Sequence, residues 1–377
     1  MSTHELIRLL VAAMVAVSVA GCDQSSKVRG KISDQPGTQQ QGLSDTGGLG
    51  GSGTASAATA VQVMEVDSAG NLTMATSANV EASGSYVVEV PAGDRLIIQA
   101  VDAQGKVIAS GVLEEAKPGQ EQVAAPLDTE TSVEASVLVQ MIRRGSARSL
   151  ANAVDLRARI NTQVAAAVKA SSDPDAKIQA LADAIIAAQR TEEESYKQSG
   201  QTATQAELFQ AEVQAAAHLD AALDRGDSAQ AAYATFSAEL DAARAQLGIT
   251  AQQEAKAESC ASSAYRATIE ARLQASVGTD AVADAAIRQA AALEAGASAA
   301  AVEATLRAAG AADATVNAAA AAAVTLRASL SAATTAAASA QAYAAYQASI
   351  EGSTTMSGTV LGSYLGVNLA TQLTADA

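Results

Sequence analysis

Tryptophan is absent from this sequence of 377 residues, and aromatic side chains make up only 2% of it. Flat stacking platforms for sugars or single-stranded bases are therefore scarce. The chain holds two histidines, so a metal site built from several histidines is excluded within one chain. The sequence contains no phosphate-binding loop, nucleophile elbow or paired-cysteine motif. We therefore predict no metal, no cofactor and no catalytic residues.

Positive charge is also scarce. The chain has 24 lysine and arginine residues against 40 acidic ones, which gives a net charge of -16. An acidic surface repels the phosphate backbone, and no block of basic residues occurs, so nucleic acid is excluded as a partner. The same net charge argues against polybasic attachment to anionic lipid.

Cysteine occurs only as Cys22 and Cys260. Cys22 follows an apolar stretch, Leu9–Val19, that is shorter than the roughly 20 residues of a membrane-spanning helix. The sequence Val19-Ala20-Gly21-Cys22 resembles the lipobox of bacterial lipoproteins. The resemblance implies that residues 1–21 are a signal peptide, cleaved between Gly21 and Cys22, and that Cys22 is lipidated. The alternatives are a signal peptide that carries a cysteine by chance and a buried thiol.

Lipidation of Cys22 would make the membrane a partner of this chain. Each buried methylene contributes about 0.8 kcal/mol, so two or three acyl chains hold a protein at the membrane without a spanning helix. We therefore expect the protein in the bacterial cell envelope. Asp23 resembles a retention signal for the inner membrane and favours that location, while the choice between inner and outer membrane stays open.

The first half of the mature chain is predicted to be β-rich. Residues 22–58 have the Gly/Ser-rich composition of a flexible tether, within which residues 27–33 could form a first strand. Residues 59–126 contain short β-type runs separated by Gly-containing turns, which is typical of an antiparallel β-sandwich. The predicted strands are VQVMEV, YVVEV, RLIIQAV and KVIASGVL.

The order of these pieces resembles the carboxypeptidase regulatory-like, or prealbumin-like, domain. The matching residues are Val28, Gly30 and Ile32 in the opening strand, Gly84 and Tyr86 in the middle, and Val90, Pro91 and Gly93 at the turn that follows. The long Gly/Ser insertion after the first strand departs from that pattern. The resemblance implies a structural spacer or a protein-contact module.

Residues 127–377 are predicted to form a separate, alanine-rich antiparallel helical bundle, so the fold class is α+β in two domains. The residues Thr131 to Glu134 have the pattern of a capping box, which predicts a helix start, and Asp173-Pro174 predicts a second one. No proline follows Pro174. Breaks between helices are expected at four glycines, which are Gly226, Gly248, Gly278 and Gly296.

Two chemically reactive residue types remain in the mature chain as single copies. His218 falls opposite the apolar face of its predicted helix, so we expect a solvated surface histidine. Cys260 lies among alanines, which favours a buried, inert thiol. Neither residue is expected to take part in catalysis.

The C-terminal region stands out because residues 328–350 carry no charge. The run contains too many serine, threonine and glutamine residues for a membrane span. We expect it to be either the central helix of the bundle or a subunit contact. Residues 328–377 could thus mediate a homo-oligomer.

These features predict a membrane-anchored envelope lipoprotein with a structural or protein-interaction role, without catalysis, whose protein partner the sequence does not identify. The alternative is a lipoprotein that binds an apolar or lipid ligand between its C-terminal helices. A cavity of roughly 300 Å³ or more lined by Leu, Ile and Tyr would favour ligand binding. A solid, alanine-packed interior would favour the structural role.

Overall fold

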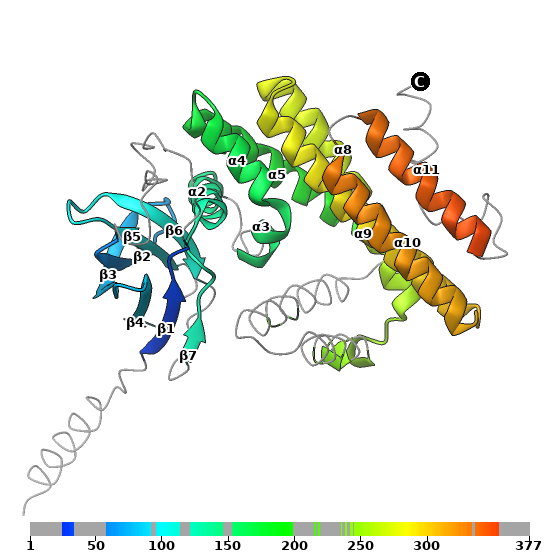
Figure 1. Cartoon of the computed structure of the whole chain (residues 1–377), viewed down its shortest axis with the longest axis horizontal. Coiled ribbons are helices and arrows are strands. Elements are labelled where there is room, and N and C mark those ends of the chain that lie inside the picture. Colours follow the sequence, from blue (N-terminus) through cyan, green and yellow to red (C-terminus); the bar gives the residue numbers. More distant parts are fainter. Residues whose placement is uncertain are drawn as a thin grey trace, which may run out of the picture.

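The computed structural model describes residues 25–33, 58–91, 96–113, 121–145, 153–198, 245–333 and 336–353, together with residues 215, 218, 235, 238, 239, 242 and 243. The predicted signal peptide, Cys22, most of the Gly/Ser-rich segment and the last 24 residues lie outside the described residues. The described part is α+β, with two β-sheets followed by a helical region (Figure 1).

The N-terminal half contains a three-stranded and a four-stranded sheet. The three-stranded sheet has the order β4-β1-β7, and the four-stranded sheet has the order β3-β2-β5-β6. All pairings are antiparallel except that of β1 with β7, which corrects the expectation of a purely antiparallel arrangement. The strands are β1 Ser26–Lys31, β2 Ala60–Val66, β3 Leu72–Asn79, β4 Ser85–Val90, β5 Leu96–Val101, β6 Val107–Leu113 and β7 Glu121–Val123.

The two sheets share one hydrophobic core. Val28 and Val88 from the smaller sheet and Val63 and Ile98 from the larger one belong to a single cluster of buried side chains. Every residue of β5 is buried, because its other face is covered as well. Ile97 points away from that cluster and packs with helix α2. The layers are therefore the small sheet, the large sheet and then helices (Figure 1).

The four strands predicted between residues 59 and 126 are confirmed as β2, β4, β5 and β6. Residues 27–33 also contribute a strand, β1, which lies in the middle of the small sheet. Strand β3 was missed because all its residues are exposed or half-buried, so no buried apolar face marks it in the sequence. Strand β7 was missed because it has only three residues.

Two of the quoted motif residues, Gly30 and Tyr86, face each other across the β1–β4 pair. The Tyr86 side chain is only 1% exposed, and its ring lies over Gly30 so closely that a methyl group there would overlap the ring and its hydroxyl. A glycine is therefore required here by the close approach of the tyrosine, and not by its backbone angles.

Gly30→Ala is expected to lower the free energy of unfolding by about 1–3 kcal/mol, because the buried ring has little room to move. Urea unfolding of the single variant, of Tyr86→Ala and of the double variant tests this. The double variant should cost less than the sum of the two single changes, since Tyr86→Ala removes the clash. Additive effects would show that Gly30 and Tyr86 do not compete for space.

Helix α2, Thr129–Arg143, follows directly after the sheets and is buried on all sides from Thr131 to Ile142. Its N-cap is Asp128, whose carboxylate accepts from the Thr131 amide at 3.0 Å, so the predicted capping box starts three residues too late. The Ser110 amide on edge strand β6 donates to Ser132 Oγ at 2.9 Å. Helix α2 thus covers the outer face and one edge of the large sheet.

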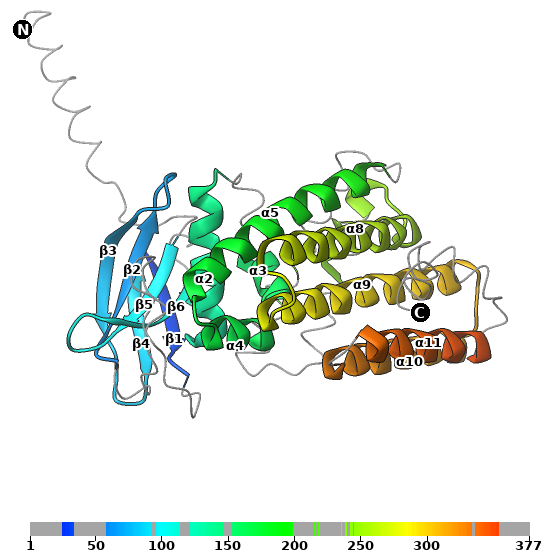
Figure 2. The ribbon, with the colours of Figure 1, turned by 90° about the horizontal axis from the view of Figure 1, so that it is seen from above.

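The remaining helices run back and forth beyond α2 (Figure 2). Contacts between Ser195 and Cys260, and between Ser259 and Ser298, show that successive long helices are antiparallel. Buried Arg159 connects three of them, since it stacks on the Tyr265 ring and pairs with Glu192. The helices are α3 Ala153–Arg159, α4 Thr162–Ala170, α5 Pro174–Gln198, α8 Ala251–Val277, α9 Ala281–Ala308, α10 Asp313–Ala332 and α11 Ala336–Ser353.

The predicted helix starts and breaks have mixed outcomes. The start at Asp173-Pro174 is confirmed, because Asp173 accepts from the Ala176 amide at 3.0 Å. The breaks at Gly248 and Gly278 are confirmed, and Gly226 lies outside the described residues. Gly296 was wrongly expected to end a helix, because α9 continues through it and it is buried there.

The predicted boundary between residues 126 and 127 stays a prediction. Leu127 still forms a bridge with Ile32, and α2 packs on the large sheet through Val133 and its neighbours. The same cluster of buried side chains continues into α4, α5, α8 and α9. The sheets and helices are thus joined through a continuous apolar contact.

Candidate functional site

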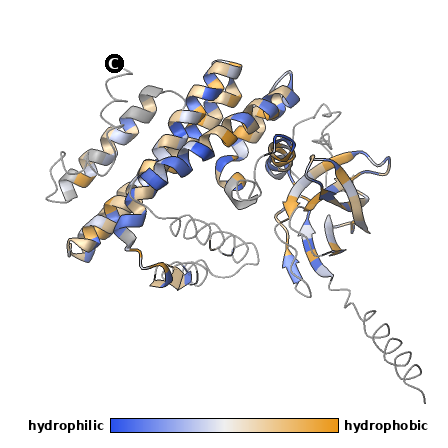
Figure 3. Ribbon diagram, turned by 180° about the vertical axis from the view of Figure 1, so that it is seen from behind, coloured by the Kyte–Doolittle hydropathy of each residue, from blue (hydrophilic) through white to orange (hydrophobic). Residues whose placement is uncertain are grey.

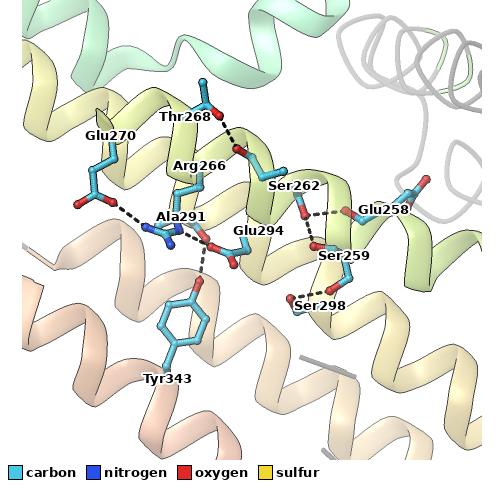
Figure 4. Close-up of polar contacts among 11 residues, drawn as sticks. Glu258, Ser259, Ser262, Arg266, Thr268, Glu270, Ala291, Glu294, Ser298 and Tyr343 are labelled. Carbon is cyan, nitrogen blue, oxygen red and sulfur yellow. Dashed lines mark hydrogen bonds and ion pairs between the residues drawn. The ribbon is translucent and has the colours of Figure 1, made fainter. Parts of the chain in front are cut away.

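A row of polar side chains lies buried between α8 and α9 (Figure 4). We call Ser259, Ser262, Arg266, Glu294 and Ser298 the polar seam. Arg266 donates through Nε to Glu294 at 2.6 Å and through Nη1 to Glu270 at 2.8 Å. The side chains of Arg266 and Glu294 are 12% and 7% exposed. The seam therefore contains an ion pair that is largely removed from water.

The other members of the seam are hydroxyl groups. Ser259 and Ser298 form a hydrogen bond of 3.2 Å between their side chains, and Ser262 donates to the Glu258 carbonyl at 2.7 Å. Alanines surround these serines on both helices, so the helix axes can approach closely enough for short side chains to meet. The polar residues thus specify how α8 and α9 align along their length.

Tyr343 of α11 extends the seam toward the C-terminus, where its hydroxyl donates to the Ala291 carbonyl at 3.0 Å. Burial, and then the negative charge of Glu294, raise the pKa of Tyr343. Burial also raises the pKa of Tyr346, three residues on, to about 12. Both phenols therefore stay protonated at neutral pH, and they anchor α11 instead of acting as bases.

The chemistry available in the seam is limited. Its serines bond to one another and to the backbone, and its arginine is held by two carboxylates. A serine nucleophile would need a base such as His218. His218 is exposed, as predicted, and its Nδ1 lies 3.1 Å from Glu239 Oε2. The geometry accordingly suits helix alignment and not acyl transfer.

An open groove of about 650 Å³ lies beside the seam, lined by Glu258 of α8, Ala328 of α10 and a stretch of α9. The α9 residues are Ala292, Leu293, Gly296, Ala297 and Ala300. Mostly small side chains, with a single leucine and one carboxylate, form this surface, whereas an apolar ligand site would be lined mainly by large aliphatic and aromatic groups. The groove thus lacks the lining of Leu, Ile and Tyr that would favour binding of an apolar or lipid ligand.

A second buried acidic side chain lies where α2 meets α3. Glu134 is 1% exposed, its Oε1 has no hydrogen-bond partner among the described residues, and its other oxygen lies 3.9 Å from Arg157 Nε. Burial raises the pKa of Glu134 to about 8, partly offset by the positive charge of Arg157. Glu130, one turn earlier, also has a raised pKa because of burial, which its hydrogen bond from Thr162 opposes.

The expectation that Cys260 is a buried thiol is corrected. Cys260 is exposed, because it shares the solvent-facing stripe of α8 with Gln253 and Lys256, while its alanine neighbours face Tyr196. In the acidic run at 192–194, Glu192 turns inward, and its carboxylate pairs with Arg159 at 2.8 Å. Alanine at neighbouring positions does not tell which helix face is buried, since alanine suits either one.

The uncharged segment 328–350 is not a central helix. It spans the end of α10, the non-helical Ala333 and most of α11. Leu330, Tyr343, Tyr346 and Ile350 are buried against the neighbouring helices, whereas a stripe on the other side of α11 is exposed. That stripe comprises Gln341, Ala344, Ala345, Ala348 and Ser349.

Comparison with models of protein families, with curated proteins and with solved structures finds no match to this chain. Within the described ranges, no group of three or more His, Cys, Asp or Glu residues could hold a metal ion. None of the helices that the structure describes has both the length and the apolar character needed to cross a membrane.

Proposed function

We propose that this chain is a lipid-anchored lipoprotein of the bacterial envelope, with a structural or protein-interaction role and no catalysis. The observation that carries the proposal is the position of Cys22 at the end of a lipobox-like sequence, only four residues before β1 begins at Ser26. The fold thus begins where the anchor would end, as expected if cleavage removes residues 1–21.

The prealbumin-like resemblance is part of the same proposal. The pairing of Gly30 with Tyr86 supports it, because two residues of the quoted motif meet in one contact. A domain of this kind next to the lipid would act as a spacer or contact module. Asp23 favours the inner membrane as the site of anchoring.

The helical region is proposed to bind a protein partner. Residues 328–377 remain the proposed contact for a homo-oligomer, and the exposed stripe on α11 supports this because it carries no charge. Two copies of a chain of net charge -16 repel each other least where neither presents charge. Binding of an apolar ligand is less well supported, since small residues line the groove.

Cys22→Ser is expected to abolish lipidation, so that the chain accumulates as a precursor or becomes soluble. Cell fractionation and mass spectrometry of the native protein measure this, and Cys260→Ser, at the other cysteine, is the matched control that should stay in the membrane fraction. A native chain with an unmodified Cys22 would contradict the proposal.

A further inference from the structure

The outer face of the small sheet differs from the rest of this acidic chain. Along β1 the side chains of Lys27, Arg29 and Lys31 alternate with buried or half-buried positions, so all three basic groups lie on the solvent side. Figure 3 shows hydrophilic and hydrophobic positions interspersed along these strands. Three basic residues thus share one exposed strand face in a chain of net charge -16.

Two exposed valines flank this row. Val87 on β4 and Val123 on β7 are both register partners of Arg29, and their exposed fractions are 47% and 43%. The acidic residues on the same face are Glu89 and Glu121, both paired with Lys27, and Glu121 forms an exposed ion pair with Arg29. We call these seven residues the basic face. It contains three basic groups and two acidic ones.

The short distance between Cys22 and β1 would keep the basic face close to the membrane that holds the lipid anchor. Ser26 is the fourth residue after Cys22, and its side chain is already buried in the sheet. A fully extended chain advances about 3.6 Å per residue, so the start of β1 lies at most about 14 Å from the anchored cysteine. Because the large sheet and helices lie on the opposite side of the small sheet, no sheet or helix among the described residues packs over the basic face.

We propose that the basic face lies on the anionic headgroups of the membrane that holds Cys22, with Val87 and Val123 reaching the interfacial region. The inference rests on the proposed lipidation of Cys22. The net positive charge of the basic face is small, so the face would bind lipid only if the anchor kept it at high local concentration beside the headgroups. It refines the argument from net charge, because the whole-chain value hides a local face of opposite sign. Helices α8–α11 would then point away from the lipid.

The test uses lipidated full-length protein in vesicles of phosphatidylcholine with or without phosphatidylglycerol. A fluorophore is placed at Val87→Cys or, as a matched control, at Met74→Cys, both in a Cys260→Ser background because Cys260 is exposed. Met74 is 56% exposed and pairs with Met64, which packs on the side of α2, so it faces away from the small sheet. Sedimentation first measures anchoring, and quenching by headgroup-labelled lipid then measures proximity.

We expect quenching at position 87 to exceed that at position 74 at least twofold in vesicles with phosphatidylglycerol, and to fall with added salt. The pair Lys27→Glu and Lys31→Glu should remove this difference, whereas Lys106→Glu and Lys256→Glu, two exposed lysines elsewhere, should leave it. Sedimentation with equal quenching at both positions, or with quenching independent of phosphatidylglycerol, overturns the inference alone. A chain that does not sediment overturns both the anchor and the inference.

Discussion

Arg266→Met is expected to lower the free energy of unfolding by about 3–5 kcal/mol, because it leaves the Glu294 carboxylate buried without its partner. The Arg266 and Glu294 side chains are 12% and 7% exposed, so water screens the abandoned charge poorly. The double variant Arg266→Met with Glu294→Leu should recover most of the loss, since a buried ion pair and apolar residues of similar volume are often equivalent in stability.

Chemical denaturation of the two single variants and the double variant measures this effect. The control is Arg307→Met, which breaks the exposed pair with Glu303 on the same helix, where the side chains are 57% and 37% exposed. Exposed pairs contribute about 0–1 kcal/mol, so the control should change little. If the Arg266 and Arg307 variants lost equal stability, the seam would not hold α8 on α9.

The second large effect is a gain in stability. Glu134→Gln should stabilise the chain at pH 8 and above by several kcal/mol, because each unit of pKa difference corresponds to about 1.4 kcal/mol. In the folded state burial raises the pKa of Glu134 to about 8. Between about pH 4.5 and pH 8, Glu134 therefore keeps its proton in the folded chain and has released it in the unfolded chain.

The direction in which stability changes with pH follows from this difference in pKa. Stability of the natural chain should fall as pH rises from the unfolded pKa, near 4.5, through about 8, and should then change no further on account of this group. The glutamine variant lacks this dependence, so the two melting curves should coincide near pH 4 and separate toward pH 8. Glu89→Gln, at an exposed position, is the matched control and should show no separation.

Much of the secondary structure could be predicted because local patterns dictate it. Strands β2, β4 and β5 carry runs of β-branched and aliphatic residues between turns, and the helix starts at Asp173 and Thr250 follow from side chains that cap nearby amides. Ile178, Leu181 and Ile185 likewise have the spacing of one helix face, and all three are buried. These features depend only on residues close in sequence.

The candidate site could not be predicted in the same way. Arg266 and Glu294 are 28 residues apart, and no local signal distinguishes them from the many charged residues on solvated helix faces. The same holds for Glu134, which was assigned to a helix start and is instead buried between elements. A charge becomes buried when another helix covers it, and that depends on long-range packing.

By itself, the sequence determined the lipobox-like pattern that ends at Cys22, the order of β-rich and alanine-rich regions and several helix caps. Only the tertiary structure decided that β1 lies at the centre of a sheet, that α2 is buried on all sides and that Cys260 is exposed. The physical reason lies in alanine and in short strands. Alanine forms a helix equally well whether its face meets water or another helix, and a strand of six residues is stable only through its neighbours.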